Sequence, residues 1–327
     1  MGGVAVSRLV LAVDGGNSKT DVAVVSEHGE VLGAGRAGGF APQRDGVAAA
    51  VDVIAAALAA LPAGVPRDGF AHVSACLAGA DLPVEEEALA AELAARELGA
   101  DVVVRNDTFA LLRAGASGPW GVAVVCGAGI NAVGVAPSGA VARLPALGRL
   151  SGDWGGGQDL GEEALWHAVR AEDGRGRPTA LARLVTSHFG TATVEELVLA
   201  VHFGLVDGDR LHELAPGVLA AAGDGDPVAR ELVERQAEEV TVLAEVCLRR
   251  LGLLETPVEV VLGGGLLTAR DPLMTKLLEA GFALRAPHAE PVVADRPPVM
   301  GAALLGLERL GAAKGALTAL STAYGPR

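Results

Sequence analysis

Short apolar runs separated by glycine-containing turns open the chain. Residues 8–15 (RLVLAVDG) and 21–26 (DVAVVS) are continuous apolar runs of strand length, and a His28-Gly29 turn leads to a third run that begins at Glu30. Apolar residues then recur at spacings of three and four between positions 47 and 61, which predicts an amphipathic helix. The opening of the chain therefore predicts three strands followed by alternating helices and strands.

The same order of elements returns further along the chain, at an offset of about 110 residues. Residues 121–126 (GVAVVC) predict a strand, a glycine-rich turn follows, and residues 131–136 predict a second strand. A Ser138-Gly139 turn then leads to a third strand that begins at Ala140. An internal repeat of mixed strands and helices predicts a duplicated α/β fold with two domains and a cleft between them.

The repeat also sets the domain boundaries that we expect. Residues 1–117 form the first predicted domain, and residues 118–312 form the second, with the hinge in the glycine-rich segment at 115–120. The second domain carries a mostly helical insertion at about residues 149–256, and residues 313–327 resemble a frayed tail.

Composition narrows the class of protein. With 26 basic and 40 acidic residues the net charge is -14, and no basic stripe is visible, so nucleic acid is not an expected partner. The three cysteines are far apart and form no CxxC pair, which argues against a disulfide framework. No signal peptide is recognised, and the longest apolar stretch, 47–62, is interrupted and too short for a membrane span, so we expect a cytoplasmic protein.

Five polar or glycine-rich motifs carry the candidate chemistry. The first, Asp14-Gly15-Gly16-Asn17-Ser18-Lys19-Thr20, lies between two predicted strands. Glycines allow a tight turn whose amides face an anion, and Asp14 could hold Mg²⁺ through water. The alternative is an ordinary hairpin in which turn amides satisfy the aspartate.

The matching turn of the repeat is Gly127-Ala128-Gly129, followed by Ile130-Asn131. It fits a dinucleotide-binding pattern, but that pattern requires a helix where a strand is predicted here. Two glycine turns at equivalent places of a duplicated fold would instead clamp a polyphosphate across the cleft. The chain has no GxxxxGK[ST] sequence, so this is not a P-loop enzyme.

Asp107 ends a predicted strand and opens a predicted helix. It could serve as a helix N-cap, or as a general base that takes a proton from an attacking hydroxyl group, and the two roles are compatible.

Two further glycine clusters complete the set. Gly152-Asp153-Trp154-Gly155-Gly156-Gly157 precedes a helix predicted from Gly161, and its glycines would let the backbone approach a ligand. Gly263-Gly264-Gly265 follows the strand VEVVL and could lie against an adenine, or simply form a tight strand-to-helix turn.

In this order the motifs resemble those of the BadF/BadG/BcrA/BcrD ATPase family, and within it the N-acetylglucosamine kinases of the sugar kinase, heat-shock chaperone and actin superfamily. Residues 14–20 look like the family's first phosphate motif, Asn106-Asp107 like its catalytic aspartate, and residues 127–131 like its GTGSN loop. Residues 152–157 are similar to its GDEGSG loop, and 263–265 to its adenosine motif. The resemblance covers nearly the whole chain.

The resemblance implies two duplicated actin-like (ribonuclease H-like) domains and an ATP-dependent kinase for N-acetylglucosamine or a related amino sugar. It implies ATP and Mg²⁺ as cofactors and a small sugar as substrate. We also expect a homodimer, with neither nucleic acid nor membrane as partner. The implied base is Asp107, Asn131 and Asp153 would hold the sugar, and Ser18 would contact the phosphates. The remaining residues of 15–20, 127–129 and 263–265 would bind ATP, and Asp14 the metal.

The sequence departs from the family pattern at several positions. Ala128 and Ile130 replace two hydroxyl residues, and Trp154 replaces an acidic one. Where the family has a sugar-contacting asparagine, residues 38–43 contain Phe40, which we expect to form an apolar wall of the sugar site.

Two other functions belong to different classes. An activator ATPase of the same family would need a cysteine-ligated iron–sulfur cluster between subunits. A sugar-sensing protein without catalysis would need neither Asp14 nor Asp107.

Overall fold

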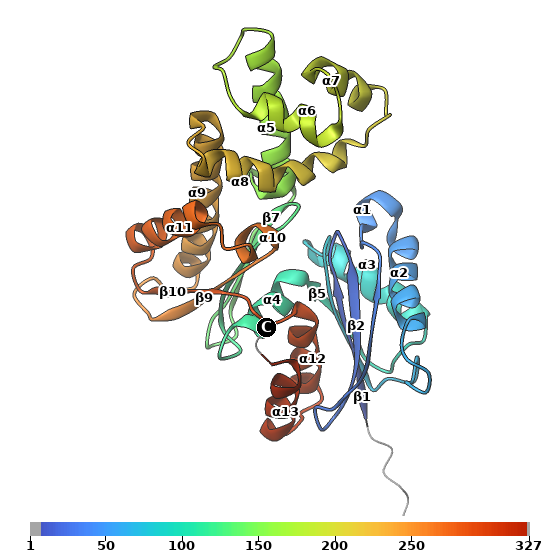
Figure 1. Ribbon diagram of the computed structural model, residues 1–327. Helices are drawn as coiled ribbons and strands as arrows, with labels where there is room; N and C mark the ends of the chain where they lie inside the picture. The colour runs from blue at the N-terminus through green and yellow to red at the C-terminus, as the bar shows by residue number, and fades with distance from the viewer. Residues whose placement is uncertain (1–7, 326–327) are drawn as a thin grey trace, which may run out of the picture. The chain divides into compact units, whose positions relative to one another are not determined.

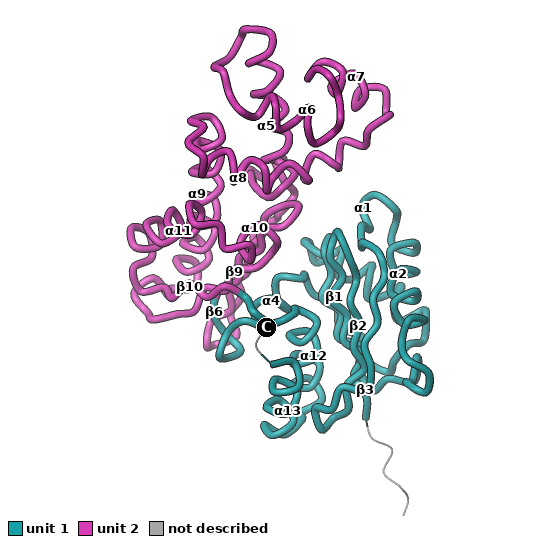
Figure 2. Tube along the Cα trace, viewed as in Figure 1, with its two compact units in different colours: residues 1–121, 294–327 teal, residues 122–293 magenta. Residues whose placement is uncertain are grey.

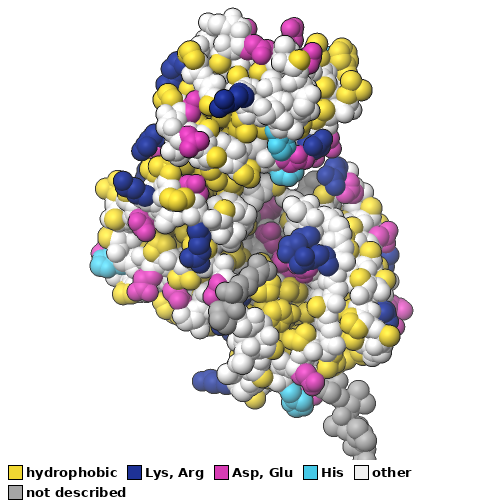
Figure 3. Space-filling model, viewed as in Figure 1, with side chains coloured by type: hydrophobic (Ala, Val, Ile, Leu, Met, Phe, Trp, Pro, Cys, Tyr) yellow, Lys and Arg dark blue, Asp and Glu magenta, His cyan; other side chains and the backbone are white. Residues whose placement is uncertain are grey.

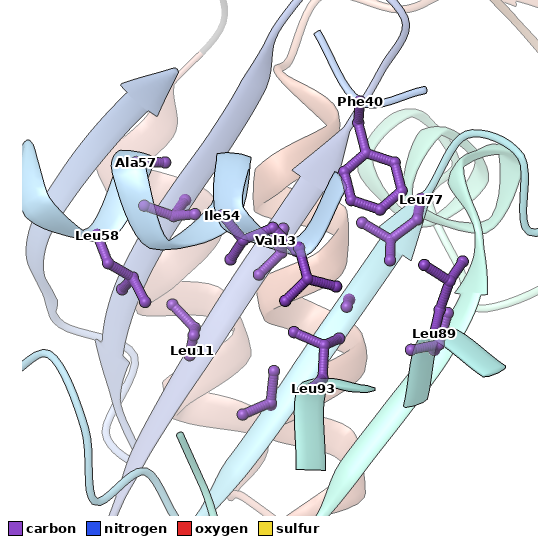
Figure 4. Packing of buried hydrophobic residues seen from close by; sticks show 14 of the residues in the cluster. Leu11, Val13, Phe40, Ile54, Ala57, Leu58, Leu77, Leu89 and Leu93 are labelled. Atoms are coloured by element: carbon purple, nitrogen blue, oxygen red, sulfur yellow. The ribbon is translucent and has the colours of Figure 1, made fainter. Parts of the chain in front are cut away.

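Two apolar runs near the start of the chain form the centre of a five-stranded sheet. In the computed structural model, which describes residues 8–325, β1 (Leu9–Gly15) and β2 (Thr20–Ser26) are buried along almost their whole length. Leu11 and Val13 face a cluster that includes Ile54 and Leu93 (Figure 4), whereas Val10 faces the opposite layer of helices. Strands covered on both faces need apolar side chains at every position, which explains the unbroken runs.

The chain forms two compact units, which Figure 2 distinguishes by colour. The described part of unit 1 comprises residues 8–121 and 294–325, and unit 2 comprises residues 122–293. In unit 1, β1 and β2 are joined by β3 (Val31–Ala37), α1 (Pro42–Asp45), α2 (Val47–Ala59), β4 (His72–Leu77), α3 (Pro83–Ala95), β5 (Val102–Asn106), α4 (Asp107–Gly115), α12 (Pro298–Arg309) and α13 (Lys314–Tyr324).

Unit 2 begins as the chain enters β6 (Gly121–Cys126). The elements that follow are β7 (Ile130–Val135), β8 (Val141–Arg143), the 3₁₀ helix η1 (Gly148–Ser151), α5 (Gly156–Glu172), α6 (Leu181–Phe189), α7 (Val194–His202), the 3₁₀ helix η2 (Gly208–Leu214), α8 (Ala215–Gly223), α9 (Pro227–Arg250), β9 (Val258–Gly263), α10 (Gly265–Thr268), α11 (Pro272–Arg285) and β10 (Ala289–Val293).

The two sheets repeat one topology. Their strand orders are β3-β2-β1-β4-β5 and β10-β9-β6-β7-β8, which become equivalent when the second is read in reverse. In the first sheet β2 lies between β1 and β3, and β4 and β5 follow in parallel on the other side of β1. In the second sheet β7 lies between β6 and β8, and β9 and β10 follow in parallel on the other side of β6. The mixed α/β fold with an internal repeat is therefore confirmed.

The end of the chain corrects the expected boundaries. Residues 294–312 were expected in the second domain, but they belong to unit 1, where α12 packs on α4 and on the sheet (Figure 1). The expectation of a frayed tail from residue 313 is also wrong, because most of that segment is α13. Helix α13 buries Ala316 and Leu320, and its small residues allow the backbone of Gly29 to approach the carbonyl of Ala316. The segment has few large apolar residues, so its hydrophobic pattern did not predict this closely packed helix.

Charges of both signs are interspersed over the visible surface (Figure 3). Some form pairs along one helix, such as Arg230–Glu234 and Arg249–Glu245 on α9, and such exposed pairs each contribute well under about 1 kcal/mol. Among the helices within residues 8–325, none has both the length and the apolar character needed to cross a bilayer.

The contact of α12 with α4 gives a stability prediction. A Cβ atom at Gly301 would lie 1.9 Å from the carbonyl oxygen of Ala110, and a backbone atom cannot move aside as a flexible side chain can. We expect Gly301→Ala to destabilise unit 1 by about 3 kcal/mol or more. Gly315→Ala on α13 is the matched control, since no atom lies within 4 Å of its added methyl group.

Gly315→Ala should be neutral or should stabilise the fold by up to about 1 kcal/mol, because alanine restricts the unfolded chain and favours helix. Urea unfolding followed by circular dichroism compares the two variants. Equal midpoints for Gly301→Ala and wild type would contradict the close backbone contact.

Candidate active site

The first glycine motif forms the turn between β1 and β2. Within it the amide of Gly16 donates to the carbonyl of Lys19 at 2.9 Å, which closes a tight hairpin. Asn17 and Ser18 lie at the exposed tip. A short turn of this kind can direct backbone amides and the Ser18 hydroxyl toward an anion.

Two residues expected to contact ligands are core residues instead. Phe40 has no exposed surface, and its ring lies beside Leu77 (Figure 4) and against the bare backbone of Gly15. Phe40 cannot line a sugar site, because the packing of the turn on the sheet uses its whole side chain. Thr20 is likewise fully buried, opposite Gly15 in the register, and its hydroxyl has no hydrogen-bond partner within residues 8–325. The predicted contact of Thr20 with ATP is therefore wrong for this conformation.

Charged side chains lie in register across the carboxyl end of β1. Asp14 pairs with Asp21 on β2, and Asp21 pairs with Arg36 on β3. The Asp21 carboxylate accepts hydrogen bonds from Arg36 at 2.5 and 3.1 Å and from Lys19 at 2.9 Å. Burial opposes the charge of Asp21, but these two cations outweigh it and lower the pKa of Asp21.

Asp14 has the opposite environment. It is 8% exposed, and burial, followed by the negative charges of Asp107 and Asp21, raises its pKa to about 8. The cations Lys19 and Arg36 compensate only in part. Asp14 is therefore a carboxylate short of positive charge, the state expected of a group that meets a cation when ligand binds.

Asp107 is the first residue of α4, but it is not the cap of that helix. The cap is Asn106, whose side chain accepts from the amide of Thr108 at 3.0 Å and donates to Asp81 at 2.8 Å. The N-cap position that the sequence allowed for Asp107 is thus occupied by Asn106. Burial raises the pKa of Asp107 to about 6, although backbone amides at residues 107 and 108 donate to it. A carboxyl group with such a pKa suits proton transfer near neutral pH.

In unit 2, the second and fourth glycine motifs pack against each other. The amide of Gly157 donates to the carbonyl of Gly127 at 2.7 Å, and that of Gln158 to Ala128 at 2.9 Å. Gly156 has a φ of 84°, and a Cβ atom there would lie 2.5 Å from Ala128. Only glycine meets both conditions. Helix α5 therefore begins within the motif, at Gly156, rather than at the predicted Gly161.

A buried glutamine on α9 positions this start of α5, and the sequence analysis missed it. Gln236 has no exposed surface, and its carbonyl oxygen accepts from the amide of Gly156 at 2.8 Å. Its side-chain amide lies where a Cβ atom of Gly155 would stand. The available signal was a polar residue on the apolar face of α9, between Val233 and Val240.

Asp153 and Asn131 are both half-buried in unit 2. The Asp153 carboxylate accepts a 2.5 Å hydrogen bond from the hydroxyl of Ser151, and the Asn131 carbonyl oxygen accepts from the amide of Ala132 at 2.7 Å. The neighbouring Trp154 is buried, with the guanidinium of Arg235 4.0 Å from its ring centre. Trp154 is thus a packing residue, which leaves Asp153 as the accessible polar group of the motif.

The last glycine motif is only partly open. Gly264 has a φ of 86°, and a Cβ atom there would lie 2.3 Å from the carbonyl oxygen of Cys126. Its missing side chain thus makes room for β6. Gly263 ends β9 and is buried, whereas Gly265 is exposed with no atom near its absent side chain. Gly265 offers the bare backbone that an adenine contact requires.

Comparison with known proteins identifies relatives among amino-sugar kinases. The N-acetyl-D-glucosamine kinase of Dictyostelium discoideum is 28% identical over 207 residues, covering 62% of this chain and 65% of that protein. The N-acetylmuramic acid/N-acetylglucosamine kinase of Clostridium acetobutylicum is 25% identical over 166 residues, covering 51% and 54%. The matched regions span less than two thirds of either relative.

The match to solved structures extends over more of the fold. The candidate N-acetylglucosamine kinase from Chromobacterium violaceum superimposes with a TM-score of 0.74 and 25% identity, covering 91% of this chain and 99% of that one. Residues 11–306 match the model of a single family. Together with the repeated sheets and the motif order, this match shows that the chain belongs to the BadF/BadG/BcrA/BcrD ATPase family.

Proposed function

We propose that this protein transfers the terminal phosphate of ATP to a hydroxyl group of N-acetylglucosamine or a similar amino sugar. The observation that carries the proposal is the state of Asp107. It is a carboxyl group at the first turn of α4, next to the N-cap Asn106, and burial raises its pKa to about 6. Its charge also acts on Asp14, beside the phosphate turn of the same unit. The amino-sugar kinases among the relatives support the substrate class.

In this mechanism the oxygen of the sugar hydroxyl forms a bond to the terminal phosphorus of ATP, and the bond from that phosphorus to ADP breaks. Asp107 accepts the proton that the hydroxyl group loses. Residues 15–19 would contact the phosphates through turn amides and the Ser18 hydroxyl, and residues 127–129 would do so through their backbone. The salt bridge to Asp21 holds the Lys19 ammonium group beside that turn. Phosphoryl transfer requires little from the protein beyond such positioning and charge.

The residues of unit 1 fit Mg²⁺ as the metal, with Asp14 as its protein partner. Within residues 8–325, three or more metal-binding side chains are nowhere grouped closely enough to enclose an ion. Mg²⁺ does not need such a group, because it usually keeps several waters and binds one or two carboxylates together with substrate phosphates. The uncompensated charge at Asp14 is the corresponding structural feature. When bound, the ion would neutralise phosphate charge.

Asp153 and Asn131 are the residues that we propose for the sugar. Both are polar, half-buried and adjacent to glycine motifs, and a carboxylate suits the recognition of sugar hydroxyls. On this proposal the helices between β8 and β9 are an insertion into the duplicated fold that holds the Asp153 loop. The homodimer and the cytoplasmic location remain predictions.

The activator-ATPase alternative receives no support from the cysteines. Cys76, Cys126 and Cys247 are all buried, and burial raises the pKa of each thiol, those of Cys126 and Cys247 to about 12. A cluster shared by two subunits needs accessible thiolates.

Replacement of Asp107 tests the base. Asp107→Asn preserves shape but cannot accept the proton, so we expect kcat to fall by about 100-fold or more. The cap is untouched because Asn106 provides it. In the wild type, kcat/KM should fall below a pH of about 6 as Asp107 becomes protonated. Asp45→Asn, at an exposed site paired with Arg44, is the control and should retain wild-type turnover. A few-fold effect of Asp107→Asn would contradict the assignment.

The raised pKa of Asp14 predicts how stability depends on pH. Between its ordinary pKa of 3.8 and its folded pKa of about 8, the folded protein binds a proton that the unfolded chain has lost. The free energy of unfolding should therefore decrease as pH rises through this range. Asp14→Asn removes the effect, so without metal and nucleotide it should raise the melting temperature near pH 8 while abolishing phosphate transfer.

Asp21→Asn provides a control of opposite sign. The pKa of Asp21 is lowered, so its charge stabilises the fold at neutral pH and its loss should reduce the melting temperature there. Thermal unfolding from about pH 5 to about pH 9, in a chelator, measures all three proteins. Wild type and Asp14→Asn with parallel pH profiles would refute the assigned state of Asp14.

Asp153→Ala tests the sugar site. We expect kcat/KM for the amino sugar to fall by about 100-fold or more, because the partner hydroxyls lose their acceptor, while ATP binding is unchanged. Asp173→Ala, at the exposed end of α5, is the matched control. A kinase assay and calorimetry with an ATP analogue separate the two effects. Unchanged KM and kcat in Asp153→Ala would exclude Asp153 as a sugar ligand.

A further inference from the structure

A cavity of about 520 Å³ lies within unit 1, lined by residues of α4, α12 and α13 and by the segments that follow α4 and precede α12. None of its lining residues belongs to the proposed ATP, metal or sugar sites. Leu304, Leu317 and Ala116 supply apolar surface, and the rest of the lining is mostly polar. The cavity therefore has walls of mixed chemistry, as expected of a site for a small polar ligand.

The charged residues of the described lining are both arginines. Arg113 and Arg296 both line the cavity, and no aspartate or glutamate is among the described lining residues. Arg113 is largely buried and is fixed by a 2.9 Å ion pair with Glu308. Arg296 is half-buried and makes no hydrogen bond or ion pair with any residue between 8 and 325. In a chain with a net charge of -14, an unpaired guanidinium in a cavity points to an anion, and phosphate suits its geometry.

Hydroxyl groups from α13 form the polar side. Thr318 donates to the carbonyl of Lys314 at 3.1 Å, Ser321 to Leu317 at 2.9 Å, and Thr322 to Thr318 at 2.9 Å. Because their protons are used within the helix, these oxygens present acceptor lone pairs. Inorganic phosphate has few P–OH groups that could donate to these acceptors, whereas a polyol carries several hydroxyl groups that can donate to them.

We propose that this cavity binds a small phosphorylated polyol, such as a sugar phosphate. Its phosphate lies at Arg296 and Arg113, and its hydroxyl groups donate to the α13 face formed by Thr318, Ser321 and Thr322. The proposal does not depend on the kinase activity, because all of its residues lie outside the proposed catalytic set. Arg296 and Ser117, a fourth hydroxyl residue of the lining, stand in the segments through which the chain enters and leaves unit 1.

Isothermal titration calorimetry on the full chain, without ATP or metal, tests the proposal with three probes. These are a hexose 6-phosphate, the same hexose without phosphate, and inorganic phosphate. We expect the hexose phosphate to bind at least about 10-fold more tightly than either of the others, because only it uses both the cations and the acceptors. Equal affinity for inorganic phosphate would overturn the role of the hydroxyls, and equal affinity for the free hexose would overturn that of the arginines.

Two variants locate the binding. Arg296→Gln should weaken hexose phosphate binding by about 10-fold or more. Ser321→Ala should weaken it about fivefold and leave the weak binding of inorganic phosphate unchanged. Arg230→Gln, which removes an exposed charge on α9 in unit 2, is the matched control and should bind as wild type. Circular dichroism establishes that each variant is folded. Hexose phosphate binding that survives Arg296→Gln at full strength would refute the site.

Discussion

Unit 1 depends on a close backbone contact between two helices that are far apart in the chain, α4 and α12. Gly301 of α12 lies against the carbonyl of Ala110 in α4, and Gly306, on the same helix, lies against Val10 and Ser74 of the sheet. A side chain at either position would push α12 away from its neighbours. Because α12 holds α4, it also fixes the first turn of α4, where Asp107 stands. The position of the proposed base thus depends on a glycine nearly two hundred residues away in sequence.

Two aspartates that are paired in register on β1 and β2, Asp14 and Asp21, have opposite electrostatic environments. Asp21 has Arg36 and Lys19 as partners and remains charged at low cost. Asp14 is buried as well, but the charges of Asp107 and Asp21 act on it, and the fold tolerates its carboxyl group most easily in the protonated state. The difference between these neighbours is not a requirement of the sheet, which would accept an uncharged residue at position 14. A persistent cost of this kind is typical of a functional site, where a ligand supplies the missing charge.

The sequence predicted the features that follow from local pattern. Unbroken apolar runs identified β1 and β2 because both faces of those strands are covered, and the repeat of strand and turn indicated the duplicated sheets. The sequence could not assign the purpose of individual glycines. Gly156 and Gly264 lie so close to the backbone of their own unit that a side chain would not fit, whereas Gly265 has open space beside it. All three belong to runs of three glycines, and the sequence of such a run does not distinguish these cases.

The sequence also could not predict the direction in which a side chain points. Phe40 was expected in the sugar site because of its place in a loop, yet the loop returns its ring to the core beside Leu77. The prediction of a frayed tail was wrong for a related reason, since α13 packs with small residues that give little periodic signal. Such interactions join residues far apart in the chain, so no local window contains them.

The glycine loop around Asp153, which we propose for the sugar, is held in place although glycine-rich segments are usually flexible. Its later glycines are fixed, because Gly155 lies against Gln236 and Gly156 lies against the turn at residues 127–129. The first amide groups of α5 also donate hydrogen bonds to that turn. Its first glycine, Gly152, has no atom near its absent side chain. Asp153 thus stands between a fixed helix start and an open turn. A side chain so placed can be held in one orientation from behind while its front remains accessible, which is the arrangement that selective recognition of a sugar requires.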